Sequence, residues 1–161
     1  MIRPYDPCDK EQVLELWHAF DEIHVTADPS KFQLPSRERM CVRHEKYTTA
    51  SPEGEKVAPY FMFVAAEKEK INGFICGMLR EAPDAALLRS YRFVELHAVY
   101  VRKYCRSGIV SRQLVRTALD YAKTCGAQKA ICHIWNFNSA AQKHIASLGF
   151  TAVSSKYEKD I

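Results

Sequence analysis

The sequence contains no apolar run long enough to cross a bilayer, and its first residues, MIRPYDPCDK, lack the apolar core of a signal peptide. We therefore expect a soluble, cytoplasmic protein that does not use a membrane as a partner. The six cysteines include no C-x-x-C pair, and the six histidines show no H-x-x-x-H spacing. These absences predict reduced thiols instead of a disulfide framework, and no metal site.

Phosphate-binding signatures of the common nucleotide folds are also missing. The chain has neither a G-x-x-x-x-G-K-[ST] loop nor a G-x-G-x-x-G turn, so ATP and dinucleotides are not favoured. The net charge of +4 is too small to suggest nucleic acid by itself. The basic residues gather at one turn and lack interleaved aromatics, and we expect no nucleic-acid partner.

The chain has 161 residues, which fits one domain spanning residues 1–161. Periodicity predicts strands at 2–5, 60–67, 71–81, 93–101, 129–135 and 150–158, and helices at 10–23, 36–47, 108–124 and 139–148. Asp9 is the expected cap of the first helix, with Gln12 three residues on. This order predicts the α+β class: a mixed sheet with helices on its faces.

One corner of this pattern is basic. The segment VRKYCRSGIVSRQ passes from a strand into a helix, and its basic residues are Arg102, Lys103, Arg106 and Arg112. Ser107 and Gly108 supply a loop where backbone N–H groups can approach a ligand, and the first turn of a helix favours phosphate. On spacing alone, a plain turn with solvated charges explains these residues equally well.

A longer segment carries a family resemblance. The segment from VELHAVYVRKYCRSGIVSRQLVR through NFNSAAQKHIASLGF resembles the core of the GNAT superfamily of acetyl-CoA-dependent N-acetyltransferases. That family shows R-x-x-G-x-G/A opening a helix, then a strand, then N-x-x-A-x-x-x-Y-x-x-x-G-F, whose last motif matches at Asn138, Ala141, Gly149 and Phe150. The resemblance covers about residues 60–150 and implies a mostly antiparallel sheet splayed between its fourth and fifth strands, with helices on both faces.

Three positions depart from the family pattern. Arg106 lies two residues before Gly108 instead of three, so either the loop is one residue shorter or Cys105 occupies the Arg position. Val110 stands where the family prefers Gly or Ala, and Ile145 stands where many members carry the Tyr that protonates the leaving thiolate.

The resemblance places acetyl-CoA, with coenzyme A as product, in a cofactor-binding core at about residues 93–150. The residues expected to contact it are Val99, Tyr100, Val101, Arg106, Ser107, Gly108, Ile109, Val110, Ser111, Arg112, Asn138 and Ala141. The main chain of 99–101 would meet the thioester oxygen, and the 106–112 turn would hold the pyrophosphate. Asn138 is also a natural helix N-cap, and both roles can coexist.

Acetyl transfer to an amine needs a base, because neutralising an amine of pKa about 10.4 at pH 7 costs about 4.6 kcal/mol. Glu95 is the first candidate, since some family members resembling histone acetyltransferases place a Glu there. His97 is the second, two residues along the same expected strand face, which would hold Glu95, His97, Val99 and Val101. A surface carboxylate at a strand end is the alternative reading of Glu95.

The acceptor is expected to be a small-molecule or peptide amine. In this family the first helices and the following loop shape the acceptor pocket, which here implicates Trp17, Phe20, Glu22, His24, Phe32 and Tyr47. The alternative function is a catalytically silent acyl-CoA-binding or protein-interaction module with the same fold. A homodimer is a further expectation, because the short segment after Phe150 leaves a sheet edge that a second chain could cover.

Overall fold

The computed structural model describes residues 1–48, 59–82, 87 and 89–159, and these form one sheet in the order β1-β2-β3-β4-β5. All neighbouring strands are antiparallel except β4 and β5, which are parallel. The expected mixed α+β sheet is therefore confirmed. The elements are β1 (Ile2–Pro4), η1 (Pro7–Asp9), α1 (Lys10–Ala27), α2 (Arg37–Thr48), β2 (Tyr60–Glu67), β3 (Lys70–Glu81), β4 (Arg92–Val101), η2 (Lys103–Cys105), α3 (Ile109–Thr124), β5 (Lys129–Cys132) and α4 (Ser139–Ala146).

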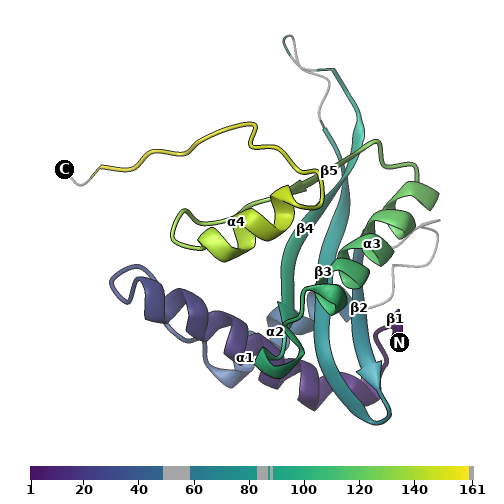
Figure 1. Ribbon diagram of the computed structural model, residues 1–161, viewed down its shortest axis with the longest axis vertical. Coiled ribbons are helices and arrows are strands. Elements are labelled where there is room, and N and C mark those ends of the chain that lie inside the picture. The colour runs from purple at the N-terminus through teal and green to yellow at the C-terminus, as the bar shows by residue number, and fades with distance from the viewer. Residues whose placement is uncertain (49–58, 83–86, 88, 160–161) are drawn as a thin grey trace.

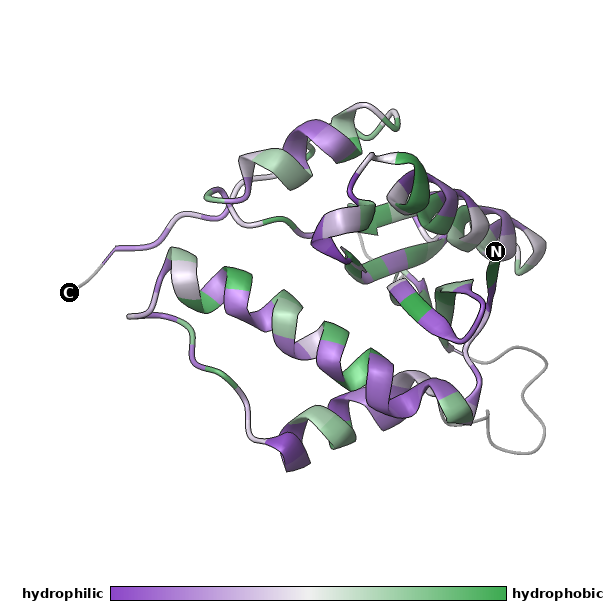
Figure 2. Ribbon diagram, turned by 60° about the horizontal axis from the view of Figure 1, so that its bottom comes forward, coloured by the Kyte–Doolittle hydropathy of each residue, from purple (hydrophilic) through white to green (hydrophobic). Residues whose placement is uncertain are grey.

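Helices cover both faces of the sheet, with α1 and α2 on one face and α3 on the other (Figure 1). On the first face Leu16 and Trp17 of α1 pack with Phe74 of β3, and on the second Ile75 of β3 packs with Leu114 of α3. Neighbouring residues of a strand point to opposite faces, so β3 serves both layers, and its buried stretch from residue 71 to 77 is apolar except for Asn72. Hydrophobic residues accordingly concentrate in the strands, whereas the helices alternate in hydropathy (Figure 2).

The sheet opens between β4 and β5. Their pairing runs only from Phe93 opposite Lys129 to Leu96 opposite Cys132, while β4 continues to Val101. Beyond Leu96, the side of β4 that faces β5 has no strand partner among the described residues. This is the expected splay, and it exposes main-chain groups of β4 close to the start of α3.

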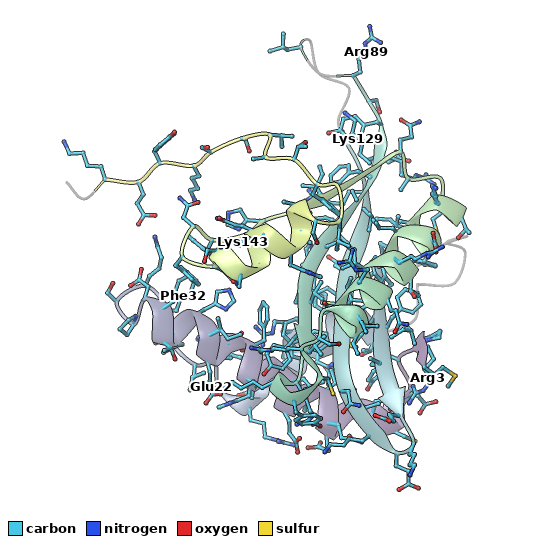
Figure 3. All side chains as sticks on the ribbon, in the orientation of Figure 1. Arg3, Glu22, Phe32, Arg89, Lys129 and Lys143 are labelled. Atoms are coloured by element: carbon cyan, nitrogen blue, oxygen red, sulfur yellow. The ribbon has the colours of Figure 1, made fainter. Side chains whose placement is uncertain are left out.

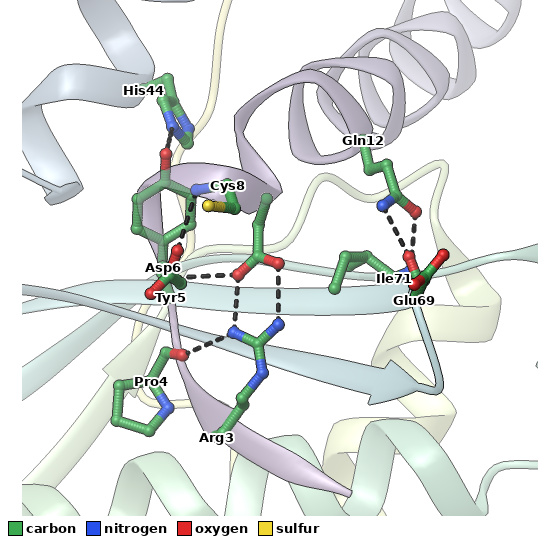
Figure 4. A network of polar contacts seen from close by, with 10 residues as sticks. Arg3, Pro4, Tyr5, Asp6, Cys8, Gln12, His44, Glu69 and Ile71 are labelled. Carbon is green, nitrogen blue, oxygen red and sulfur yellow. Dashed lines mark hydrogen bonds and ion pairs between the residues drawn. The ribbon is translucent and has the colours of Figure 1, made fainter.

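The N-terminal strand is fixed to α1 by a polar network (Figure 4). Asp9 is 5% exposed and takes two bonds of 2.7 Å from the Arg3 guanidinium and one of 2.9 Å from the Asp6 N–H. Asp9 therefore does not cap α1 with Gln12 as expected. Its carboxylate instead completes a capping box with Asp6 on η1, because Arg3 and the Asp6 N–H claim its oxygens first.

Gln12 bonds to the β2–β3 turn instead, accepting from the Ile71 N–H at 2.8 Å and donating to the Glu69 carbonyl at 2.9 Å. The second helix begins as expected, since the Ser36 hydroxyl accepts from the Arg39 N–H at 3.3 Å. Of the turn-rich stretch before β2, residues 49–58 lie outside the described part of the chain.

Two expectations for the C-terminal part are wrong. The fifth strand ends at Cys132 instead of residue 135, and residues 150–158 form no strand but run as an extended segment away from the sheet (Figure 1). A strand needs a hydrogen-bonded neighbour, and this segment pairs with no strand in the described part of the chain. Its Glu158 instead pairs with Lys31, after α1, at 2.5 Å. No helix in the described ranges is long and apolar enough to span a membrane.

Candidate active site

A β-bulge in β4 shapes the site. Cys76 of β3 pairs with Ala98, and the next residue, Gly77, pairs with Leu96. His97 is therefore an extra residue of β4 that lies opposite no residue of β3. A bulge of this kind bends the strand and redirects side chains. The close approach of the backbones explains Gly77, because a Cβ there would lie 2.4 Å from the carbonyl oxygen of Glu95.

The bulge inverts the alternation of β4 after His97. The expectation that Glu95, His97, Val99 and Val101 share one face is therefore wrong beyond His97. Val99 and Val101 pack with Leu96 on the α3 side. Glu95 and His97 do lie together, with 3.6 Å between Oε2 and Nε2.

The two candidate bases belong to a chain of four polar side chains. Arg80 of β3 donates to Glu95 Oε2 at 2.9 Å, and the Tyr47 hydroxyl of α2 lies 2.8 Å from His97 Nδ1. A donated O–H from Tyr47 leaves the imidazole proton on Nε2, facing Glu95. Two further elements, β3 and α2, thus orient the pair, although Arg80 was not among the expected site residues.

Burial and pairing set the charge states. Burial raises the pKa of Glu95, but the Arg80 hydrogen bond and the nearby His97 outweigh it, so the pKa lies below its ordinary value. Burial lowers the pKa of His97, and Glu95 offsets this only in part. Burial also raises the pKa of Tyr47 far above its ordinary value. At neutral pH the site therefore holds a carboxylate, a neutral imidazole and a neutral phenol.

Glu95 and His97 face a cavity of about 330 Å³ between α1, the loop after it, β4 and the end of β5. Of the residues expected to shape the acceptor pocket, Phe20, His24 and Phe32 line it. The others do not line it: Trp17 is in the core, Tyr47 touches His97 from behind, and Glu22 pairs with His18 on the surface of α1.

Sequence reasoning missed six lining residues, Asp21, Val25, Gln33, Leu96, His133 and Trp135. The last two come directly after β5, in the segment originally assigned to that strand. The sequence feature that could have indicated His133 and Trp135 is the run HIWNF ahead of Asn138. It combines polar and aromatic residues at the point where β4 and β5 separate.

The basic residues between β4 and α3 have different partners in the structure. Arg102 turns away, donating to the Ile71 carbonyl at 3.0 Å and to Glu15 at 3.1 Å. Arg106 donates to the Val101 carbonyl at 2.9 Å, and its guanidinium lies 5.2 Å from the Tyr100 ring centroid. Arg106 thus closes the loop onto β4.

The turn into α3 has the backbone of a ligand-binding loop. Gly108 adopts a φ of 83°, which favours glycine. The Arg112 N–H donates to the Gly108 carbonyl at 3.2 Å and closes the first turn of the helix. The N–H groups ahead of it belong to the first turn of α3, where no helical carbonyl precedes them, and the Ile109 N–H donates to the Ser107 hydroxyl at 3.4 Å. Ser111 and Val110 lie in the same turn, which suits a phosphate.

On α4, His144 Nε2 is buried without a hydrogen-bond partner in the described part of the chain. Burial, and then the charge of Arg112, lower the pKa of His144. A buried polar atom left unpaired is costly unless a ligand or water satisfies it. Asn138 caps α4, accepting from the Ala141 N–H at 3.1 Å. A cavity of about 540 Å³ lies between α3 and the end of α4, and Arg112, Ser147 and Leu148 are among its lining residues.

Several solved structures share this fold. A mutant of the BH1408 protein from Bacillus halodurans has a TM-score of 0.88 at 20% identity, with 100% of this chain and 99% of that chain covered. A putative acetyltransferase from Agrobacterium tumefaciens has a TM-score of 0.70 at 19% identity, with coverages of 100% and 99%. The aminoglycoside N-acetyltransferase AAC(6')-Iy, in complex with CoA, has a TM-score of 0.73 at 17% identity, with coverages of 100% and 93%.

At these identities the likeness establishes the fold alone, and a search of the curated proteins found no match. The sequence identifies the family, because residues 17–150 match the model of the family described as "Acetyltransferase (GNAT) family". The match includes the β4 bulge, the turn into α3 and the cap of α4. The chain therefore belongs to the GNAT acetyltransferase family.

Proposed function

We propose that the protein is an N-acetyltransferase that moves an acetyl group from acetyl-CoA to a primary amine by direct attack within a ternary complex. The observation that carries this proposal is the Glu95–His97 pair at the β4 bulge, which faces a cavity beside the splayed edge of the sheet. The pair provides a proton acceptor within reach of an amine in the cavity.

The donor supplies an activated acetyl thioester. The amine nitrogen forms a bond to the carbonyl carbon, and the bond from that carbon to sulfur breaks. Glu95 takes the proton that the amine loses, directly or through His97, and the thiolate leaves. N–H groups along residues 99–101 of β4 stabilise the developing oxyanion, because the splay frees that edge.

The turn at residues 106–112 holds the pyrophosphate of the donor through the unpaired N–H groups of α3, and Asn138 and Ala141 border its pantetheine arm. Ile145 lacks the acidic hydrogen of a Tyr. The thiol has a pKa near 8.5 and can leave as the thiolate, so a strong acid is dispensable.

A thermal-shift titration with acetyl-CoA, using ATP as the phosphate control, tests the donor. Saturation at about 100 times Kd adds roughly 2.7 kcal/mol, or on the order of 5–10 °C. We expect this shift with acetyl-CoA and none with ATP, followed by amine-dependent release of free thiol. A shift without thiol release from any primary amine would favour a silent acyl-CoA-binding module, and no shift at all would contradict donor binding.

A further inference from the structure

The cavity beside Glu95 has a continuous aromatic wall. Phe32, labelled in Figure 3 between the end of α1 and α4, meets His24 at 5.4 Å and Trp135 at 5.1 Å between ring centroids. Trp135 in turn meets His133 edge-on at 5.2 Å. These four rings come from α1, the loop after it and the segment after β5, and all line the cavity. A wall of this kind favours an apolar or aromatic ligand body.

The charges around the cavity are nearly neutralised. Its two lining carboxylates are Asp21 and Glu95. Arg43 holds Asp21 through bonds of 3.0 and 2.6 Å, and Arg80 holds Glu95 at 2.9 Å. Paired carboxylates leave little field for several cationic groups, whereas a single amine needs only the group that takes its proton.

The lysine beside the aromatic wall is also paired. Lys31 Nζ lies 5.2 Å from the centroid of the Trp135 ring and 2.5 Å from Glu158. Its charge is therefore largely neutralised, as are those of Asp21 and Glu95, and it adds little field at the cavity. The volume of about 330 Å³ is at the lower end of the range for small-molecule sites, enough for a single ring with a short arm.

We infer that the acceptor is a small primary monoamine on an aromatic or apolar body, with its nitrogen at Glu95 and His97 and its body against Phe32 and Trp135. The inference rests on the proposed function and narrows it. Phe32 and Trp135 are then the residues that determine specificity, and polycationic amino sugars are excluded.

The test compares two single-ring monoamines, 2-phenylethylamine and the polyhydroxylated glucosamine, with kanamycin as the polycation. We expect kcat/KM to be at least about tenfold higher for 2-phenylethylamine than for either other amine. Trp135→Leu and Phe32→Leu should each lower that value about tenfold, which corresponds to about 1.4 kcal/mol. Trp135→Phe keeps an aromatic ring, so its kcat/KM for 2-phenylethylamine should fall less than that of Trp135→Leu. Tyr157→Leu is the matched control, because Tyr157 is 91% exposed and lies outside the cavity.

Calorimetric binding of 2-phenylethylamine without acetyl donor separates this inference from the proposed function. Binding that weakens in both leucine variants, without transfer to any amine, would support the aromatic site and contradict the enzyme. Equal or faster transfer to glucosamine or kanamycin would overturn the inference and leave the enzyme standing. Absence of binding, or equal binding in wild type and variants, would also overturn the inference.

Discussion

Glu95 meets an arginine and an imidazole at once, and this arrangement determines what kind of base it can be. Arg80 keeps it ionised at neutral pH, which makes it ready to accept a proton but lowers its basicity. His97, neutral through burial, lies between Glu95 and Tyr47. We infer that the pair works as a unit, in which His97 shares the proton that Glu95 alone holds weakly.

Tyr47→Phe tests the orientation of His97. The variant removes the hydroxyl 2.8 Å from Nδ1 and should cost about 0.5–1.5 kcal/mol of stability. The freed imidazole can rotate or change tautomer, so we expect kcat to fall about tenfold and the pH–rate profile to shift. The measurement is steady-state kinetics across pH, together with urea unfolding.

Tyr60→Phe is the control for this variant. Its ring meets Tyr47 edge-on at 5.7 Å, but it has no bond to His97 in the described ranges. An equal loss of kcat in both variants would show that the loss does not depend on the Tyr47–His97 bond, because both variants keep their rings and lose only a hydroxyl.

At the scale of elements, the turn into α3 depends on one glycine. Gly108 has a φ of 83°, and a Cβ there would meet no atom within 4 Å. Gly108→Ala should therefore cost about 1 kcal/mol through backbone strain alone. We also expect severalfold weaker acetyl-CoA binding by calorimetry, because the strained turn shifts the N–H groups of α3.

Gly149→Ala provides a matched comparison. Gly149 has a φ of 88° and equally open surroundings, but it follows α4. Both variants should lose similar stability in urea unfolding, and only Gly108→Ala should lose affinity. Equal affinity of the two variants for acetyl-CoA would contradict the assignment of the turn into α3 to the donor site.

The elements themselves were largely predictable, since apolar periodicity located β2, β3, β4, α1 and α3 within a few residues. The bulge at His97 was not, because an extra residue leaves no mark on the alternation of apolar residues. A strand at residues 150–158 was expected from periodicity, yet this segment pairs with no strand in the described part of the chain, although β5 ends the sheet. The shared face of Glu95 and His97 was predicted, while Arg80 and Trp135 required the three-dimensional pairing of distant segments.

At the scale of the whole molecule, acid stability reflects groups that burial holds neutral. Burial lowers the pKa of His44, His97 and His144 below the ordinary value of about 6.5. The unfolded chain then binds more protons than the folded chain below that pH, so stability is present above about pH 6.5 and falls below it. The pKa of Asp9 is lowered in the folded protein. Its contribution to stability is therefore lost only at lower pH, when the pH falls through that lowered pKa.

We therefore expect the free energy of unfolding in urea to decline as pH falls below about 6.5, well before the carboxylates titrate. Raised salt should change this slope little, because burial and not exposed charge pairing is its main cause. A free energy that stayed constant down to about pH 4.5 would contradict the burial of these imidazoles.

The measurement that tests the central claim most directly is Glu95→Gln, with kcat/KM for the amine and Kd for acetyl-CoA determined on the same preparation. We predict that kcat/KM falls about 10²–10³-fold while Kd stays within about twofold. Glu81→Gln is the control, because Glu81 forms a similar pair with Arg92 at 2.6 Å on the sheet but lies outside the cavity. An unchanged kcat/KM in Glu95→Gln, or an equal loss in Glu81→Gln, would contradict the assignment of Glu95 as the general base.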